Sequence, residues 1–115
     1  MSPDGDSNPP THGDRLAEHL AIVNWLRVDR DGKPDLPHAL RYTGISRFET
    51  DGTQWPDGAY SVVCAFATPL SEHGTPIEAK VRFLVDHAPH ERLVAGVRFR
   101  LYEGPHEVAW IEVLW

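Results

Sequence analysis

Cysteine is almost absent from this sequence, and so are long apolar runs. The one cysteine, Cys64, rules out a disulfide within the chain, as is typical of proteins kept in a reducing compartment. Nothing approaches the roughly 18 consecutive apolar residues of a membrane-spanning helix. Met1 to Asp14 carry acids and prolines where a secretory signal would be basic and then apolar. We therefore expect a cytoplasmic protein that does not span a membrane.

Positive charge is also scarce. Eleven lysines and arginines stand against 17 acidic residues, and the formal net charge is −6. Such a chain repels the phosphate backbone of nucleic acids, whose binding depends on clustered Lys and Arg. The arginines here are scattered and fall mostly on the polar side of alternating segments. The charge therefore argues against a nucleic-acid partner.

The beginning of the chain has almost no apolar residues. Residues 1–15 are mostly Pro, Gly, Asp, Ser and Asn. Such a segment cannot bury enough apolar surface to offset the entropy lost on ordering. We predict a disordered tail over residues 1–15 and a single domain over residues 16–115, which is enough chain for one hydrophobic core.

What the domain does have is alternation with a period of two. From Ile77 to Val85 the apolar residues alternate with Glu78, Lys80 and Arg82, which predicts a half-buried strand. Similar patterns, separated by turns rich in Gly, Pro and Asp, predict strands at His38–Glu49, Ala59–Ala67, Val97–Leu101 and Glu107–Trp115. The last of these is apolar on both faces, which indicates a central position or a covered outer face.

Two features of the predicted strands are less regular. Leu16 to Val28 has near-helical spacing of leucines, yet its second half is dense in β-branched and aromatic residues and leads into a turn at Asp29–Pro34. We expect a strand from about His19 to Val28. Gly44, inside the next strand, suggests a bulge or a tight bend. Six short strands without a long helix predict an all-β fold, either a closed antiparallel barrel or a sandwich.

The order of strands and turns resembles the C-terminal (third) domain of translation elongation factor Tu. The similar residues are Gly96 to Gly104, with an Arg-Phe pair and a Glu-Gly turn, followed by the strand Val108 to Leu114. A first hairpin with Arg41-Tyr42-Thr43-Gly44 corresponds more loosely to the family's Gly-Tyr-Arg-Pro strand. The resemblance implies a six-stranded antiparallel β-barrel of the kind found as stand-alone bacterial proteins.

The same resemblance implies a role in docking aminoacyl-tRNA and a nucleotide-exchange factor. Of the Gly-Tyr-Arg-Pro motif, however, only Tyr42 is plainly kept, which argues against tRNA docking. The chain also has no Gly-x-x-x-x-Gly-Lys-[Ser/Thr] loop to hold the phosphates of GTP, so no GTPase activity is expected.

No group of residues predicts catalysis, a cofactor or a metal site. Cys64 shares a strand face with apolar residues, which favours burial over nucleophilic reactivity. His87 and His90 lie three residues apart, but Pro89 keeps them off a helical face and further zinc ligands are not apparent. Glu112 stands on an apolar strand, and if its face is buried it must pair with an arginine such as Arg98 or Arg100 across the sheet.

The four tryptophans are the most distinctive residues. Trp25 and Trp110 lie within strands and are predicted to be core or barrel-wall residues, whereas Trp55 and Trp115 are the better candidates for exposure. An exposed Trp55 near Arg41 or Arg47 would form a protein-binding hot spot. The alternative is that Trp55 folds over one end of the barrel as a plug. The predicted partner-binding residues are Arg41, Tyr42, Arg47 and Trp55.

These observations rank three functions. The first is a non-catalytic module that binds another protein, for example an accessory or immunity-type protein whose acidity complements a basic partner. The second is a translation-related RNA-binding protein, which requires a basic stripe joining Arg41, Arg47, Arg98 and Arg100. The third is a small-molecule-binding barrel, which requires a hollow interior.

Overall fold

The computed structural model describes residues 18–115, and the predicted tail over residues 1–15 lies outside them. Six strands form the framework of the described chain. They are β2 (His19–Trp25), β3 (Arg41–Phe48), β4 (Ser61–Ala65), β5 (Ile77–Phe83), β6 (Arg98–Glu103) and β7 (His106–Val113). Two short helices, α2 (Leu70–His73) and a 3₁₀ turn at His90–Arg92, lie in the connections. Within residues 18–115, no helix is long and apolar enough to cross a membrane.

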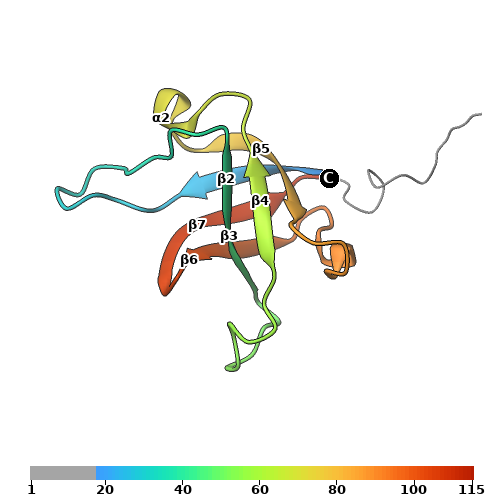
Figure 1. Ribbon diagram of the computed structural model, residues 1–115. Helices are drawn as coiled ribbons and strands as arrows, with labels where there is room; N and C mark the ends of the chain where they lie inside the picture. The colour runs from blue at the N-terminus through green and yellow to red at the C-terminus, as the bar shows by residue number, and fades with distance from the viewer. Residues whose placement is uncertain (1–17) are drawn as a thin grey trace, which may run out of the picture.

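The strands close into an antiparallel barrel in the order β2-β5-β4-β3-β6-β7, with β7 pairing back to β2 (Figure 1). This confirms the predicted all-β, six-stranded antiparallel barrel. Closure gives every strand two neighbours, and so removes the unpaired edges that a small open sheet would expose. It also explains the final strand: β7 lies between β6 and β2, which is the central position that its apolar sequence indicates.

The interior is filled by the inward side chains of all six strands. Val23, Val81, Phe83, Leu101 and Ile111 are almost completely shielded from solvent. The aromatic rings of the core pack in a row, with 4.8 Å between the ring centres of Phe48 and Phe99 and 6.2 Å between those of Phe48 and Phe83. Side chains packed in this way occupy the interior of the barrel.

The segment with mixed helix and strand signals is the strand β2. Ala21, Val23 and Trp25 are buried and alternate with half-buried residues, which is the period of a strand. The β-branched and aromatic residues prevail because β2 pairs along its length with β5 on one side and β7 on the other. Of the leucines whose spacing resembles a helix, Leu16 lies outside the described residues, and Leu26, after the strand, is exposed.

Most predicted strand boundaries differ from the structure by one to three residues, and the first strand ends at Trp25 rather than at Val28. The second strand begins at Arg41, three residues later than predicted, because the chain from Leu26 to Leu40 forms a long hairpin that extends from the barrel (Figure 1). The loop predicted between β4 and β5 contains the one-turn helix α2. Its residue Leu70 is fully buried, so this connection also contributes to the core.

Candidate binding site

The outer wall of β3, β6 and β7 gathers arginine and tryptophan side chains. Since side chains alternate across a strand, the buried Phe48, Phe99 and Ile111 oblige their neighbours to face outward. The register then places Arg47 opposite Arg100, and Arg100 opposite Trp110. We call this surface the arginine–tryptophan face and define it by Arg47, Trp55, Arg98, Arg100 and Trp110.

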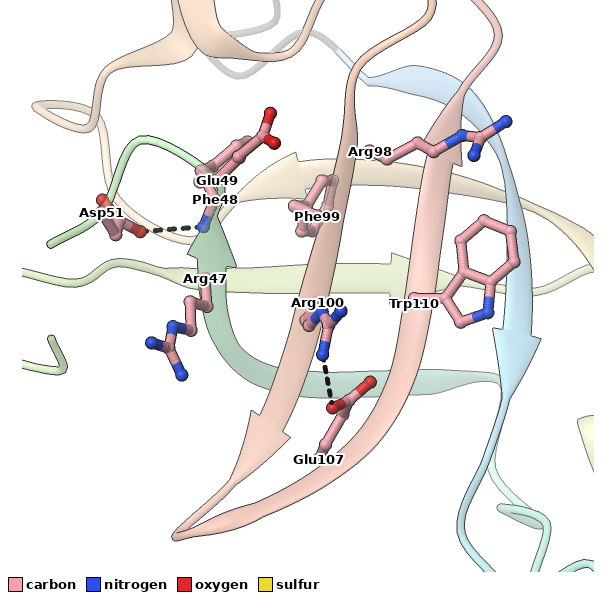
Figure 2. Close-up of a pocket in the computed structure, with 9 residues that line it drawn as sticks. All are labelled: Arg47, Phe48, Glu49, Asp51, Arg98, Phe99, Arg100, Glu107 and Trp110. Atoms are coloured by element: carbon pink, nitrogen blue, oxygen red, sulfur yellow. Dashed lines mark hydrogen bonds and ion pairs between the residues drawn. The ribbon is translucent and has the colours of Figure 1, made fainter. Parts of the chain in front are cut away.

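An open groove of about 630 Å³ runs over this face. In Figure 2, Arg100 and Glu107 lie between Arg47 on one side and Trp110 on the other. The residues that line the groove are polar or aromatic, and the side chains of two of them, Phe48 and Phe99, point into the core: Arg47, Phe48, Glu49, Asp51, Arg98, Phe99, Arg100, Glu107 and Trp110. Because three of these are arginines and three are acids, the lining is close to neutral.

Two of the three arginines are paired with carboxylates of β7. Arg100 Nη1 lies 3.1 Å from Glu107 Oε1, and Arg98 Nε lies 3.5 Å from Glu112 Oε1. The second pair confirms the prediction that Glu112 pairs with an arginine across the sheet. Both arginine side chains are more than half exposed, so each pair stabilises the fold by no more than about 1 kcal/mol.

Trp55 takes neither of the two positions considered from the sequence. It is half-buried and lies against the outer wall, with its ring centre 4.5 Å from that of Tyr102. Its indole Nε1 donates a hydrogen bond of 2.8 Å to the Ser46 carbonyl oxygen. The guanidinium of Arg47 then covers the Trp55 ring at 4.9 Å from the ring centre, a cation–π contact. Arg98 covers Trp110 in the same way at 5.6 Å.

The four predicted partner-binding residues occupy two separate places. Arg47 and Trp55 are in contact on the arginine–tryptophan face. Arg41 and Tyr42 lie at the opposite end of β3, where Arg41 is exposed and pairs in register with Ala65. From the sequence, the alternation around Phe99 indicates that Arg98 and Arg100 face outward. It does not indicate that Trp110 and Arg47 lie on the same face. The missing information was the pairing of β6 with both β3 and β7.

Tyr42 belongs to a cluster that anchors the long hairpin. Its ring packs edge-on against Trp25 at 5.0 Å, and its hydroxyl donates a hydrogen bond to Glu103. Burial, and then the Glu103 carboxylate, raise the pKa of Tyr42 above its usual range. Arg27 completes the cluster, with Nη1 3.0 Å from Glu103 Oε1 and Nε 3.2 Å from Asp35 Oδ2. These contacts join the hairpin to the β6–β7 turn and have a structural role.

The residues considered for catalysis or metal binding lie away from the groove. Cys64 is buried in β4 as predicted, and burial raises the pKa of its thiol to about 12. The rings of His87 and His90 pack edge-on against Tyr60 and Phe83, respectively. Among residues 18–115, no group of three or more His, Cys, Asp or Glu side chains could hold a metal ion.

No family model, curated protein or solved structure matches the chain. The protein is therefore classified by its own structure. It is a small closed β-barrel with a filled interior and a groove on the arginine–tryptophan face of its outer wall.

Proposed function

We propose that this protein is a non-catalytic binding module that contacts another protein through the arginine–tryptophan face. The observation that carries the proposal is the contact between the outward Arg47 and Trp55 beside a groove that also contains Arg98, Arg100 and Trp110. Arginine and tryptophan are the residues most enriched at the energetic centres of protein interfaces. The filled interior supports the same proposal, because it leaves the outside of the barrel as the surface for recognition.

The two rival functions have less support. An RNA-binding stripe requires Arg41, Arg47, Arg98 and Arg100 together, but Arg41 lies at the far end of β3 and two of the others are paired with carboxylates. A small-molecule barrel requires an internal cavity, and Phe48, Phe83 and Phe99 occupy the interior instead. The nearly neutral lining of the groove and the net charge of −6 also favour a protein partner over a polyanion.

An accessory or immunity-type protein in the cytoplasm is the form of this proposal that the chain's acidity supports, since a negative surface speeds association with a basic partner. A stand-alone barrel related to the third domain of elongation factor Tu remains our proposal for its origin. It rests on the resemblance in Gly96–Gly104 and Val108–Leu114 and is compatible with the closed six-stranded architecture.

Affinity capture with a matched pair of tryptophan variants tests the proposed function. Trp110→Ala removes an aromatic side chain from the groove, whereas Trp115→Ala removes one that is 74% exposed beyond the end of β7. We expect the wild type and Trp115→Ala to retain a stoichiometric protein partner from the native host and Trp110→Ala to lose it, with circular dichroism showing all three folded. Equal retention by both variants, or recovery of no stoichiometric protein, would contradict the proposal.

A further inference from the structure

Arg47 differs from the other two arginines of the groove because it has no carboxylate partner among residues 18–115. Arg98 pairs with Glu112 and Arg100 with Glu107. The nearest acid along β3 is Glu49, and Figure 2 shows its carboxylate pointing away from the Arg47 guanidinium. A guanidinium carries five N–H donors in a fixed planar fork that fits a carboxylate, so the donors of Arg47 remain for a ligand.

The register makes an anion at this position favourable. Arg47 faces Arg100 directly across the β3–β6 pair. Like charges directly opposite each other destabilise a sheet, and Glu107 supplies one negative charge for these two positive ones. A carboxylate brought by a partner would pair with Arg47 without displacing Glu107 from Arg100.

Arg47 is also held in place before any partner binds. Its guanidinium lies 4.9 Å from the centre of the Trp55 ring. That ring is itself fixed by its hydrogen bond to the Ser46 carbonyl and by packing on Tyr102. An arginine that is already ordered loses less side-chain entropy when it binds an anion, which strengthens binding.

From these observations, and resting on the proposed function, we propose that the groove binds a peptide segment that carries a single acidic residue within an otherwise basic partner. One Asp or Glu carboxylate of that segment pairs with Arg47, and an adjacent apolar side chain packs on Trp110. A peptide is favoured over a nucleic acid because Glu49, Asp51 and Glu107 line the same groove and would repel a continuous run of phosphates. One unpaired guanidinium calls for a single carboxylate.

Selection of displayed random dodecapeptides against the folded protein tests this proposal. We expect the enriched peptides to share an acidic residue next to an apolar one. For a synthetic peptide from that set, Arg47→Gln should weaken binding about tenfold, the loss expected for one charge-assisted hydrogen-bonded pair. Arg47→Lys, which keeps the charge without the planar fork, should weaken it less. Arg30→Gln, the same change at an exposed position of the long hairpin, should leave binding unchanged.

A double-mutant cycle isolates the contact. Replacing the peptide's acid by its amide should weaken binding to the wild type and have little further effect on the Arg47→Gln variant. Selection of no peptide, selection of peptides without an acid, or additive losses in the cycle would overturn the proposal, as would a single-stranded RNA binding more tightly than the peptides. If Trp110→Ala loses the host partner but Arg47→Gln keeps it, the proposed function stands and this inference fails. If both variants keep the partner, the proposed function fails as well.

Discussion

At the scale of single residues, Gly44 determines how closely two strands of the barrel approach each other. A Cβ atom built on Gly44 would lie 2.7 Å from Leu101 Cγ and 2.9 Å from the Tyr102 carbonyl oxygen. The register of β6 against β7 shifts between these same two residues, Leu101 and Tyr102. Gly44, where the sequence suggests a bulge or a bend, therefore permits a close approach of β3 to β6. The register shift lies in the neighbouring pair of strands, β6 and β7.

Gly44→Ala is accordingly expected to destabilise the protein. The new methyl group would displace the Leu101 side chain and press on backbone that cannot easily move, which costs about 1–3 kcal/mol of unfolding free energy. Gly52→Ala is the matched control, because nothing lies within 4 Å of its Cβ position. Urea unfolding followed by tryptophan fluorescence measures both, and equal midpoints for the two variants would contradict the prediction.

Some residue positions could be predicted and others could not. The outward arginines of β6 follow from simple alternation with Phe99, and the pairing of Glu112 follows from the cost of an unpaired charge on an apolar strand. The position of Trp55 could not be predicted, because a loop side chain has no periodicity to fix its direction. It depends on Tyr102 and Ser46, which only the folded barrel brings beneath it.

At the scale of elements, the hairpin from Leu26 to Leu40 is attached to the barrel by a few polar contacts near its base. Trp25 Nε1 donates a hydrogen bond of 2.6 Å to the Asp35 carbonyl oxygen. Arg27 joins Asp35 to Glu103, and Tyr42 donates a hydrogen bond to the same Glu103 carboxylate. Glu103 therefore connects three segments that are distant in sequence.

This connection should depend on pH. The hydrogen bond from Tyr42 is the main cause that lowers the pKa of Glu103 below its ordinary value. A carboxyl whose pKa is lowered by folding stabilises the protein fully above its unfolded pKa of about 4.3, and that contribution is lost as the pH falls through the folded value. Glu103→Gln should thus reduce stability at neutral pH by at most about 1 kcal/mol, since the side chain is half exposed.

The difference between wild type and Glu103→Gln should shrink as the pH falls below about 4.3 and disappear once the pH is below the lowered pKa of Glu103 in the folded protein. Urea midpoints measured across this range test the expectation. In a Tyr42→Phe background, which lacks the donor, the effect of Glu103→Gln should be smaller at every pH. Glu78→Gln, on the exposed outer face of β5, serves as the control and should leave the pH profile unchanged. A difference between wild type and Glu103→Gln that persists in acid would show that the connection is not electrostatic.

The elements themselves were largely predictable, because buried and more exposed residues alternate along β5 and along much of β2 and β3. Their ends were less so. β3 starts late because the preceding residues belong to the hairpin, and α2 is too short to show a helical period. The order of strands around the barrel was not predicted, since pairing partners depend on contacts distant in sequence.

At the scale of the whole molecule, we expect closure to make the barrel unfold as one cooperative unit. Each of the six strands is held on both sides, so no strand of the barrel can leave without breaking two ladders. Cys64 reports on this property, because it lies at 1% exposure in β4, between β3 and β5. Its reaction with a thiol reagent requires the barrel to open.

We therefore expect Cys64 to be labelled only through global unfolding. Its burial and its pKa of about 12 leave almost no reactive thiolate in the folded protein. At neutral pH the labelling rate should be at least about 1,000-fold below that of the unfolded chain, in line with a stability of 5 kcal/mol or more. The free energy derived from labelling should equal that from urea unfolding, and Gly44→Ala should lower both equally.

A Cys64→Ala variant with Ala67→Cys, an exposed position just beyond β4, provides the control for a thiol that needs no opening. Labelling of Cys64 that is fast and insensitive to Gly44→Ala would instead show that the β4 region opens locally and that closure does not unite the barrel.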